Sequence, residues 1–205
     1  MTRVGFACAY TPLPIIEAAG ATAHRLLPQT DAEDRSGRIL HDNLCPHVKR
    51  ILDRVMAADM PELRGTVLMN SCDAMRRLAD GWHLVRTEDR LVLLDLPPTA
   101  EPSAIRFFAT ELERLRQSLG EWTGSPVSDE SLREAIERHN QLVEAIHRLR
   151  DRQREGTFAG GSASLQRFYN AISTQSTAES LEQVENLLAE PPAQNTSDGV
   201  PVLLF

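Results

Sequence analysis

The sequence lacks the short motifs that identify the commoner enzyme classes. It contains no GxGxxG or GxxxxGK[ST] loop, no HExxH and no GxSxG. Nicotinamide, ATP, zinc-protease and serine-hydrolase chemistry therefore have no motif support. No apolar run approaches the roughly 18 residues needed to cross a bilayer, and no segment repeats along the chain.

Basic charge is scarce relative to acidic charge. The formal net charge of the 205 residues is −7, so nothing overall attracts a phosphate backbone, and nonspecific nucleic-acid binding is not expected. The N-terminal residues MTRVGFACAY lack the pattern of a signal peptide. We expect a cytoplasmic protein without nucleic-acid or membrane partners.

Cysteine is also rare. The three cysteines, Cys8, Cys45 and Cys72, form no CxxC pair. An odd number does not favour a secreted disulfide framework, and free thiols in a cytosolic chain are typical of metal binding, catalysis or simple burial.

What the first half of the chain does contain is an alternation of strand and helix patterns. Strand-like segments occur at 4–10, 22–28, 64–70 and 90–97, with helix patterns between them. The apolar run RLVLLDLP is typical of a parallel strand covered on both faces. The alternation predicts an α/β fold with a doubly wound, mainly parallel sheet of the flavodoxin or Rossmann kind.

Beyond Pro98 the pattern becomes helical. We expect an α/β domain over 1–98, a helical region over 99–190, and a linker leading into a strand over 191–205. The last six residues, VPVLLF, resemble the start of a buried strand that no helix follows. A second α/β domain is therefore expected to be missing.

The predicted topology brings the three cysteines toward one edge of the sheet. Cys8 falls late in the first predicted strand, Cys45 precedes a helix, and Cys72 follows a strand. Ligands of such folds bind outside the carboxyl ends of the strands. Three buried cysteines that act as small hydrophobic residues are one interpretation. A soft three-sulfur site, with helix N-termini stabilising the thiolates of Cys45 and Cys72, is the other.

Three thiolates leave one corner of a metal site open. With zinc, His47 or His41 completes a Cys3His site; with iron and sulfide, the remaining iron binds water or substrate. Arg76 and Arg77, in the first turns after Cys72, are either solvated surface or contacts for an anion such as acyl-CoA.

The contexts of the cysteines resemble those of one family. The segments VGFACAYTPLPIIEAAGATAHRL, LCPHVKRILD and NSCDAMRRLADGW are similar, in order, to the cysteine segments of 2-hydroxyacyl-CoA dehydratase subunits. This family includes the 2-hydroxyglutaryl-CoA dehydratase D-component and the benzoyl-CoA reductase subunits. The segment from LDLPPTAEPS onward is similar to the helical part of the family, and the resemblance covers roughly residues 4–150.

The resemblance implies a [4Fe-4S] cluster held by Cys8, Cys45 and Cys72 in a lyase subunit. Such enzymes eliminate water from an (R)-2-hydroxyacyl-CoA through a ketyl radical. The implied partners are a second homologous subunit, as a heterodimer or by self-association, and an ATP-dependent iron-sulfur activator. Leu13-Pro14 stands where relatives carry acidic residues, and Glu17 follows a turn later. Whether this chain binds substrate or relays electrons is therefore left open.

Two further interpretations stay open. One is a component of an ATP-coupled reductase of the benzoyl-CoA or double-cubane kind, which uses the same cluster. The other is a noncatalytic interaction domain stabilised by zinc at Cys8, Cys45, Cys72 and His47.

Overall fold

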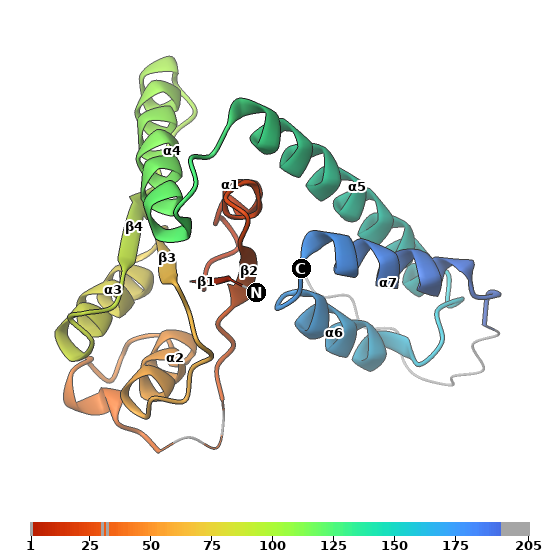
Figure 1. Cartoon of the computed structure of the whole chain (residues 1–205). Coiled ribbons are helices and arrows are strands. Elements are labelled where there is room, and N and C mark those ends of the chain that lie inside the picture. The colour runs from red at the N-terminus through yellow and green to blue at the C-terminus, as the bar shows by residue number, and fades with distance from the viewer. Residues whose placement is uncertain (1, 30, 32, 194–205) are drawn as a thin grey trace. The chain divides into compact units, whose positions relative to one another are not determined.

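The computed structural model describes residues 2–29, 31 and 33–193, and Figure 1 labels its elements. The strands are β1 (Arg3–Phe6), β2 (Thr22–Arg25), β3 (Gly65–Asn70) and β4 (Leu91–Asp95). The helices are α1 (Leu13–Ala18), the short 3-10 helix η1 (Ser36–Arg38), α2 (Pro46–Met56), α3 (Asp73–Val85), α4 (Pro102–Thr123), α5 (Asp129–Arg154), α6 (Gly161–Ile172) and α7 (Thr177–Ala189).

The four strands form one parallel sheet in the order β2-β1-β3-β4. The central pair aligns Phe6 of β1 with Val67 of β3, so the carboxyl ends of these strands lie side by side. Helices α1 and α4 contact each other, as do α2 and α3. Figure 1 shows these two pairs on opposite sides of the strands. The predicted doubly wound α/β fold is confirmed.

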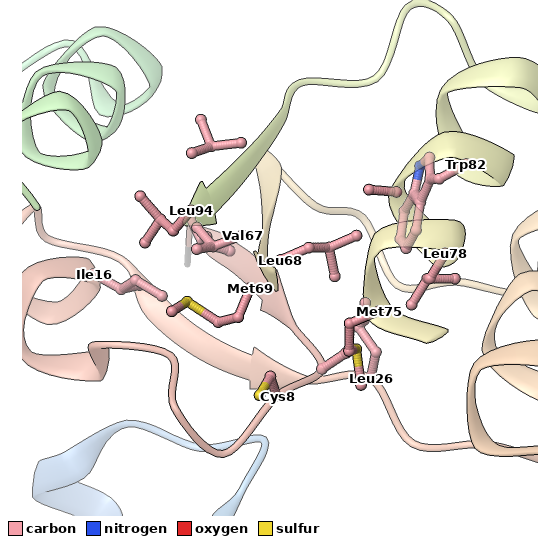
Figure 2. Packing of buried hydrophobic residues seen from close by; sticks show 14 of the residues in the cluster. Cys8, Ile16, Leu26, Val67, Leu68, Met69, Met75, Leu78, Trp82 and Leu94 are labelled. Atoms are coloured by element: carbon pink, nitrogen blue, oxygen red, sulfur yellow. The ribbon is translucent and has the colours of Figure 1, made fainter. Parts of the chain in front are cut away.

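One hydrophobic core joins the sheet to its helices. Val67, Leu68 and Met69 of β3 are fully buried, which explains the uninterrupted apolar run of this strand. Figure 2 shows them packed among residues of α1, α3 and β4. At the start of β3, a Cβ atom on Gly65 would lie 2.5 Å from the ring of Trp122 in α4, so the strand and the helix approach closely because the residue is glycine.

The first predicted strand is too long. β1 ends at Phe6 and not at Tyr10, so Cys8 lies beyond the strand and not within it. The reason is local: the amide of Thr11 donates to the carbonyl of Cys8 at 3.2 Å, which closes a turn and carries the chain out of the sheet toward α1.

The chain divides into two compact units, one ending at Ile136 and the other beginning at Glu137. The first contains the sheet and all three cysteines. In the second, the later part of α5 packs with α6 and α7, and the centre of each contact is apolar: Leu149 and Val184 are fully buried. The division of the sequence into 1–98 and 99–190 stays a prediction.

The strand expected at 200–205, and most of the linker before it, lie outside the described residues. Within 2–193, as far as that range is described, no helix has the length and apolar character needed to cross a membrane.

Candidate functional site

Two cysteines reach the carboxyl edge of the sheet from neighbouring strands. Cys8 follows the end of β1 by two residues, and Cys72 follows the end of β3 by two residues. Because β1 and β3 are adjacent and parallel, both cysteines leave the sheet at the same edge. Cys8 is buried, whereas Cys45 and Cys72 are exposed, and all three are free thiols.

A side-chain contact joins the Cys8 and Cys72 segments. The Sγ atom of Cys8 lies 3.2 Å from the hydroxyl of Ser71, the residue before Cys72. Figure 2 shows Cys8 at the margin of the hydrophobic residues drawn. The sulfur atom therefore lies at the border between the core and the carboxyl edge.

A second contact brings in the Cys45 segment. His47, in the first turn of α2, forms a hydrogen bond with the backbone of Ala7, the residue before Cys8. Burial lowers the pKa of His47, the positive charge of Arg25 lowers this pKa further, and the bond to Ala7 opposes both effects. One residue from each of the other two cysteine segments, Ser71 and His47, therefore contacts the segment that contains Ala7 and Cys8.

Cys45 and Cys72 occupy equivalent positions on their helices. Cys45 is the N-cap residue of α2 and Cys72 is the N-cap residue of α3. Neither side chain makes a capping hydrogen bond, so the protein does not use these thiols to complete its own helices. Helix N-termini carry partial positive charge, which favours thiolates and anionic groups at this place.

Polar atoms without partners gather at the same edge. The side-chain oxygen of Thr11 is buried and has no hydrogen-bond partner among the described residues, and the same holds for the Nε atom of Arg25 at the end of β2. Buried polar groups are normally paired. Thr11 lies three residues after Cys8, in the turn that its amide closes by donating to the Cys8 carbonyl.

The donor set decides which metal group these residues fit. In the part of the chain that the structure describes, no three His, Cys, Asp or Glu side chains are grouped to hold one metal ion. Zinc needs its ligands to converge on a single atom. A four-iron cluster takes each thiolate on a different iron, so three separated thiols at one edge fit such a cluster better.

The two arginines after Cys72 are occupied by neighbours on their own helix. Arg76 pairs with Asp73 at 2.7 Å, and Arg77 pairs with Asp80 at 2.7 Å. The hydrogen bond from Arg76 lowers the pKa of Asp73. Both arginines are exposed, and their predicted contact with an anion or CoA stays a prediction.

A polar network fastens the adjoining strand ends. Asn70 at the end of β3 donates to Asp95 at the end of β4 at 2.7 Å, and the amide of Asp95 donates to Glu111 of α4. Arg114 donates to Glu111 at 2.6 Å and to the carbonyl of Leu93 at 2.7 Å. The network fixes the backbone immediately before Ser71 and Cys72.

A hollow between the strands and helices of the first unit lies away from the cysteines. A cavity of about 450 Å³ opens beside Gly65 and Arg90, at the amino ends of β3 and β4, with Trp82 in its wall. This is the edge of the sheet opposite to the cysteines, so the hollow is not part of their site.

Sequence reasoning missed three residues of this edge: Thr11, Arg25 and Ser71. Thr11 belongs to the Tyr-Thr-Pro sequence that follows Cys8, and this resemblance to the family could have pointed to it. Ser71 meets a residue 63 positions away, and no local pattern reveals such a contact.

Fold and site together define a doubly wound α/β protein with three thiols at the carboxyl edge of its sheet. The chain belongs to the family described as 2-hydroxyglutaryl-CoA dehydratase, D-component, whose sequence model matches residues 8–204. It is also similar to one of the benzoyl-CoA reductase subunits of Thauera aromatica, with 23% identity over 150 residues. That match covers 70% of this chain and 39% of the relative. The predicted family membership is confirmed.

Proposed function

We propose that the chain is an iron-sulfur subunit of a 2-hydroxyacyl-CoA dehydratase-type lyase, acting in the cytoplasm. In this proposal Cys8, Cys45 and Cys72 hold a [4Fe-4S] cluster. The observation that supports it is that Cys8 and Cys72 leave the sheet at the same edge, where the Cys8 sulfur contacts Ser71, and that His47 of the Cys45 segment contacts the backbone of Ala7. Family membership supports the same assignment.

In this proposal the three cysteines hold the cluster from different parts of the fold. Cys8 is buried beside the core and anchors one side, while the exposed Cys45 and Cys72 approach from two helix N-termini whose partial positive charge balances an anionic group. When bound, the cluster supplies single electrons and a Lewis-acidic iron for the elimination of water from an (R)-2-hydroxyacyl-CoA. Thr11 offers a hydroxyl to this group or to its ligand.

Partners are part of the proposal. The relative from Thauera aromatica is by name one of the subunits of a reductase, and the chain spans 39% of its length. We infer a second homologous subunit or a second copy of this chain, an ATP-dependent iron-sulfur activator, and an acyl-CoA substrate that contacts Arg76 or Arg77.

Anaerobic reconstitution with iron and sulfide tests the cofactor. We expect a brown protein with about four iron and four sulfide per chain, and loss of the cluster in Cys8→Ser, Cys45→Ser and Cys72→Ser. Ser118→Ala is the matched control, because the Ser118 hydroxyl donates to the carbonyl of Arg114 in its own helix. A colourless wild-type protein that retains no iron would contradict the proposal.

One substitution distinguishes a zinc site from an iron-sulfur cluster. His47→Ala removes the fourth ligand of a Cys3His site, so zinc affinity collapses if zinc is the native metal. A cluster held by three cysteines survives this change, with at most a reduced loading from the lost contact to Ala7.

A reductase is the second candidate reaction, and the likeness to the benzoyl-CoA reductase of Thauera aromatica favours it. The loaded chain, combined with its activator, its partner subunit and ATP, should dehydrate a 2-hydroxyacyl-CoA. Reduction of benzoyl-CoA without dehydration would assign the reductase reaction instead.

A further inference from the structure

Ser71 is held in place from both sides. The preceding Asn70 is bonded to Asp95 of the neighbouring strand, and the following Cys72 is the N-cap residue of α3. Between these two fixed points the Ser71 side chain points to Cys8, with 3.2 Å between Oγ and Sγ. The backbone on both sides of Ser71 is therefore held, which keeps its Oγ atom beside the Cys8 sulfur while the hydroxyl proton is free to turn toward it.

The direction of this hydrogen bond depends on the state of the sulfur. In the free thiol either atom can donate. A thiolate, or a sulfur atom bound to iron, has no proton left, so the hydroxyl of Ser71 must then be the donor. Hydrogen bonds to charged acceptors are the stronger kind, and partial burial of the pair strengthens this one further.

A hydrogen bond to a cluster sulfur acts on the redox equilibrium. Reduction adds negative charge to the cluster and its ligand sulfur atoms, so a donor aimed at one of them stabilises the reduced state more than the oxidised state. Cys8 is the buried ligand candidate, whereas Cys45 and Cys72 are exposed. Water therefore competes least with Ser71 at Cys8.

We propose that Ser71 is a positioning residue for the Cys8 sulfur and raises the reduction potential of the cluster by donating a hydrogen bond from its hydroxyl to that sulfur. This inference rests on the proposed function, because it assumes that Cys8 is a ligand. It assigns a role to a side chain that itself does not bind iron.

The test compares reduction potentials of reconstituted wild-type protein, Ser71→Ala, Ser71→Thr and Ser71→Val, titrated anaerobically and followed by absorbance and electron paramagnetic resonance. Threonine and valine have nearly the same shape, and only threonine keeps the hydroxyl. Ser71→Ala and Ser71→Val should have more negative potentials, by roughly tenfold in the equilibrium constant of reduction, which is about 59 mV for one electron. Ser71→Thr should stay near the wild type, as should the control Ser118→Ala.

The outcomes separate this inference from the function on which it rests. The inference is also supported if Ser71→Ala and Ser71→Val fail to bind the cluster while Ser71→Thr binds it, because the hydroxyl then holds the Cys8 sulfur in place. Equal reduction potentials in all variants that bind the cluster would overturn the inference. Loss of the cluster in both Ser71→Thr and Ser71→Val would also overturn it, because the size of the side chain and not the hydroxyl would then decide cluster binding. A wild-type chain without iron contradicts the proposed function first, and this inference with it.

Discussion

Asp53 offers the sharpest test of what holds the Cys45 segment in place. This carboxylate of α2 is buried, with 1% of its surface exposed. Its Oδ1 atom accepts from the amides of Arg35 at 2.9 Å and Ser36 at 2.7 Å, and its Oδ2 atom accepts from Arg50 at 3.2 Å. One side chain thus ties the segment before Cys45 to the helix after it.

The cost of removing Asp53 follows from these bonds. Asp53→Ala leaves two backbone N–H groups without an acceptor, at about 1–3 kcal/mol each, and only the Ser36 bond is fully buried. We expect a loss of about 3 kcal/mol in the free energy of unfolding. Asp53→Asn keeps an oxygen for both amides and loses the charge pair with the one-third exposed Arg50, so about 1 kcal/mol is expected.

The assay is urea unfolding followed by tryptophan fluorescence. The chain has two tryptophans, Trp82 and Trp122, and both belong to the first unit, so the signal reports on the unit that contains Asp53. Asp59→Ala is the control, because Asp59 is exposed and pairs with Arg54 at 3.4 Å; a change below about 0.5 kcal/mol is expected there. The reasoning would be refuted if the free energy of unfolding of Asp53→Ala stayed within about 1 kcal/mol of the wild type, below the range for unpaired buried amides. It would also be refuted if Asp53→Asn lost as much stability as Asp53→Ala.

Three further predictions concern other parts of the chain. Gly65→Ala places a methyl group 2.5 Å from Trp122 and should cost about 1–3 kcal/mol, with a shift in tryptophan emission; an unchanged midpoint in urea would contradict the close approach. Arg114 holds the pKa of Glu111 below its ordinary value, so this contribution to stability is full above that ordinary value and is lost as the pH falls through the lowered pKa. Unfolding measured from about pH 7 down to about pH 3, across the ordinary carboxyl pKa, should therefore show a smaller acid loss in Glu111→Gln than in the wild type, and parallel curves would argue against the pair. Ser176→Ala removes the capping box of α7 and should cost about 1 kcal/mol, visible as a lower thermal midpoint by circular dichroism, whereas no shift would show that the cap contributes nothing.

Much of the fold followed from the sequence because parallel strands buried on both faces are short apolar runs between helical periods. The pattern placed the strands around Val67 and Leu94 correctly, and both residues are buried in the core. The pattern wrongly extended the first strand to Tyr10, because the apolar residues Ala7 and Cys8 are buried like strand residues. They lie beyond the end of the strand, at a turn outside the hydrogen-bonded sheet. Hydrophobicity alone does not distinguish these two environments.

The sequence by itself determined the three cysteines, their positions after strands or before helices, and their likeness to one family, because these properties depend on residues close together in the chain. Tertiary structure decided which other groups share their edge. Ser71 reaches Cys8 across 63 positions, and Asp53 reaches the amide of Ser36 across 17. The first pair forms because the parallel sheet brings the carboxyl ends of β1 and β3 to the same edge, and only the folded register of these strands fixes which side chains meet there. The second forms because helix α2 packs against η1, the segment before it.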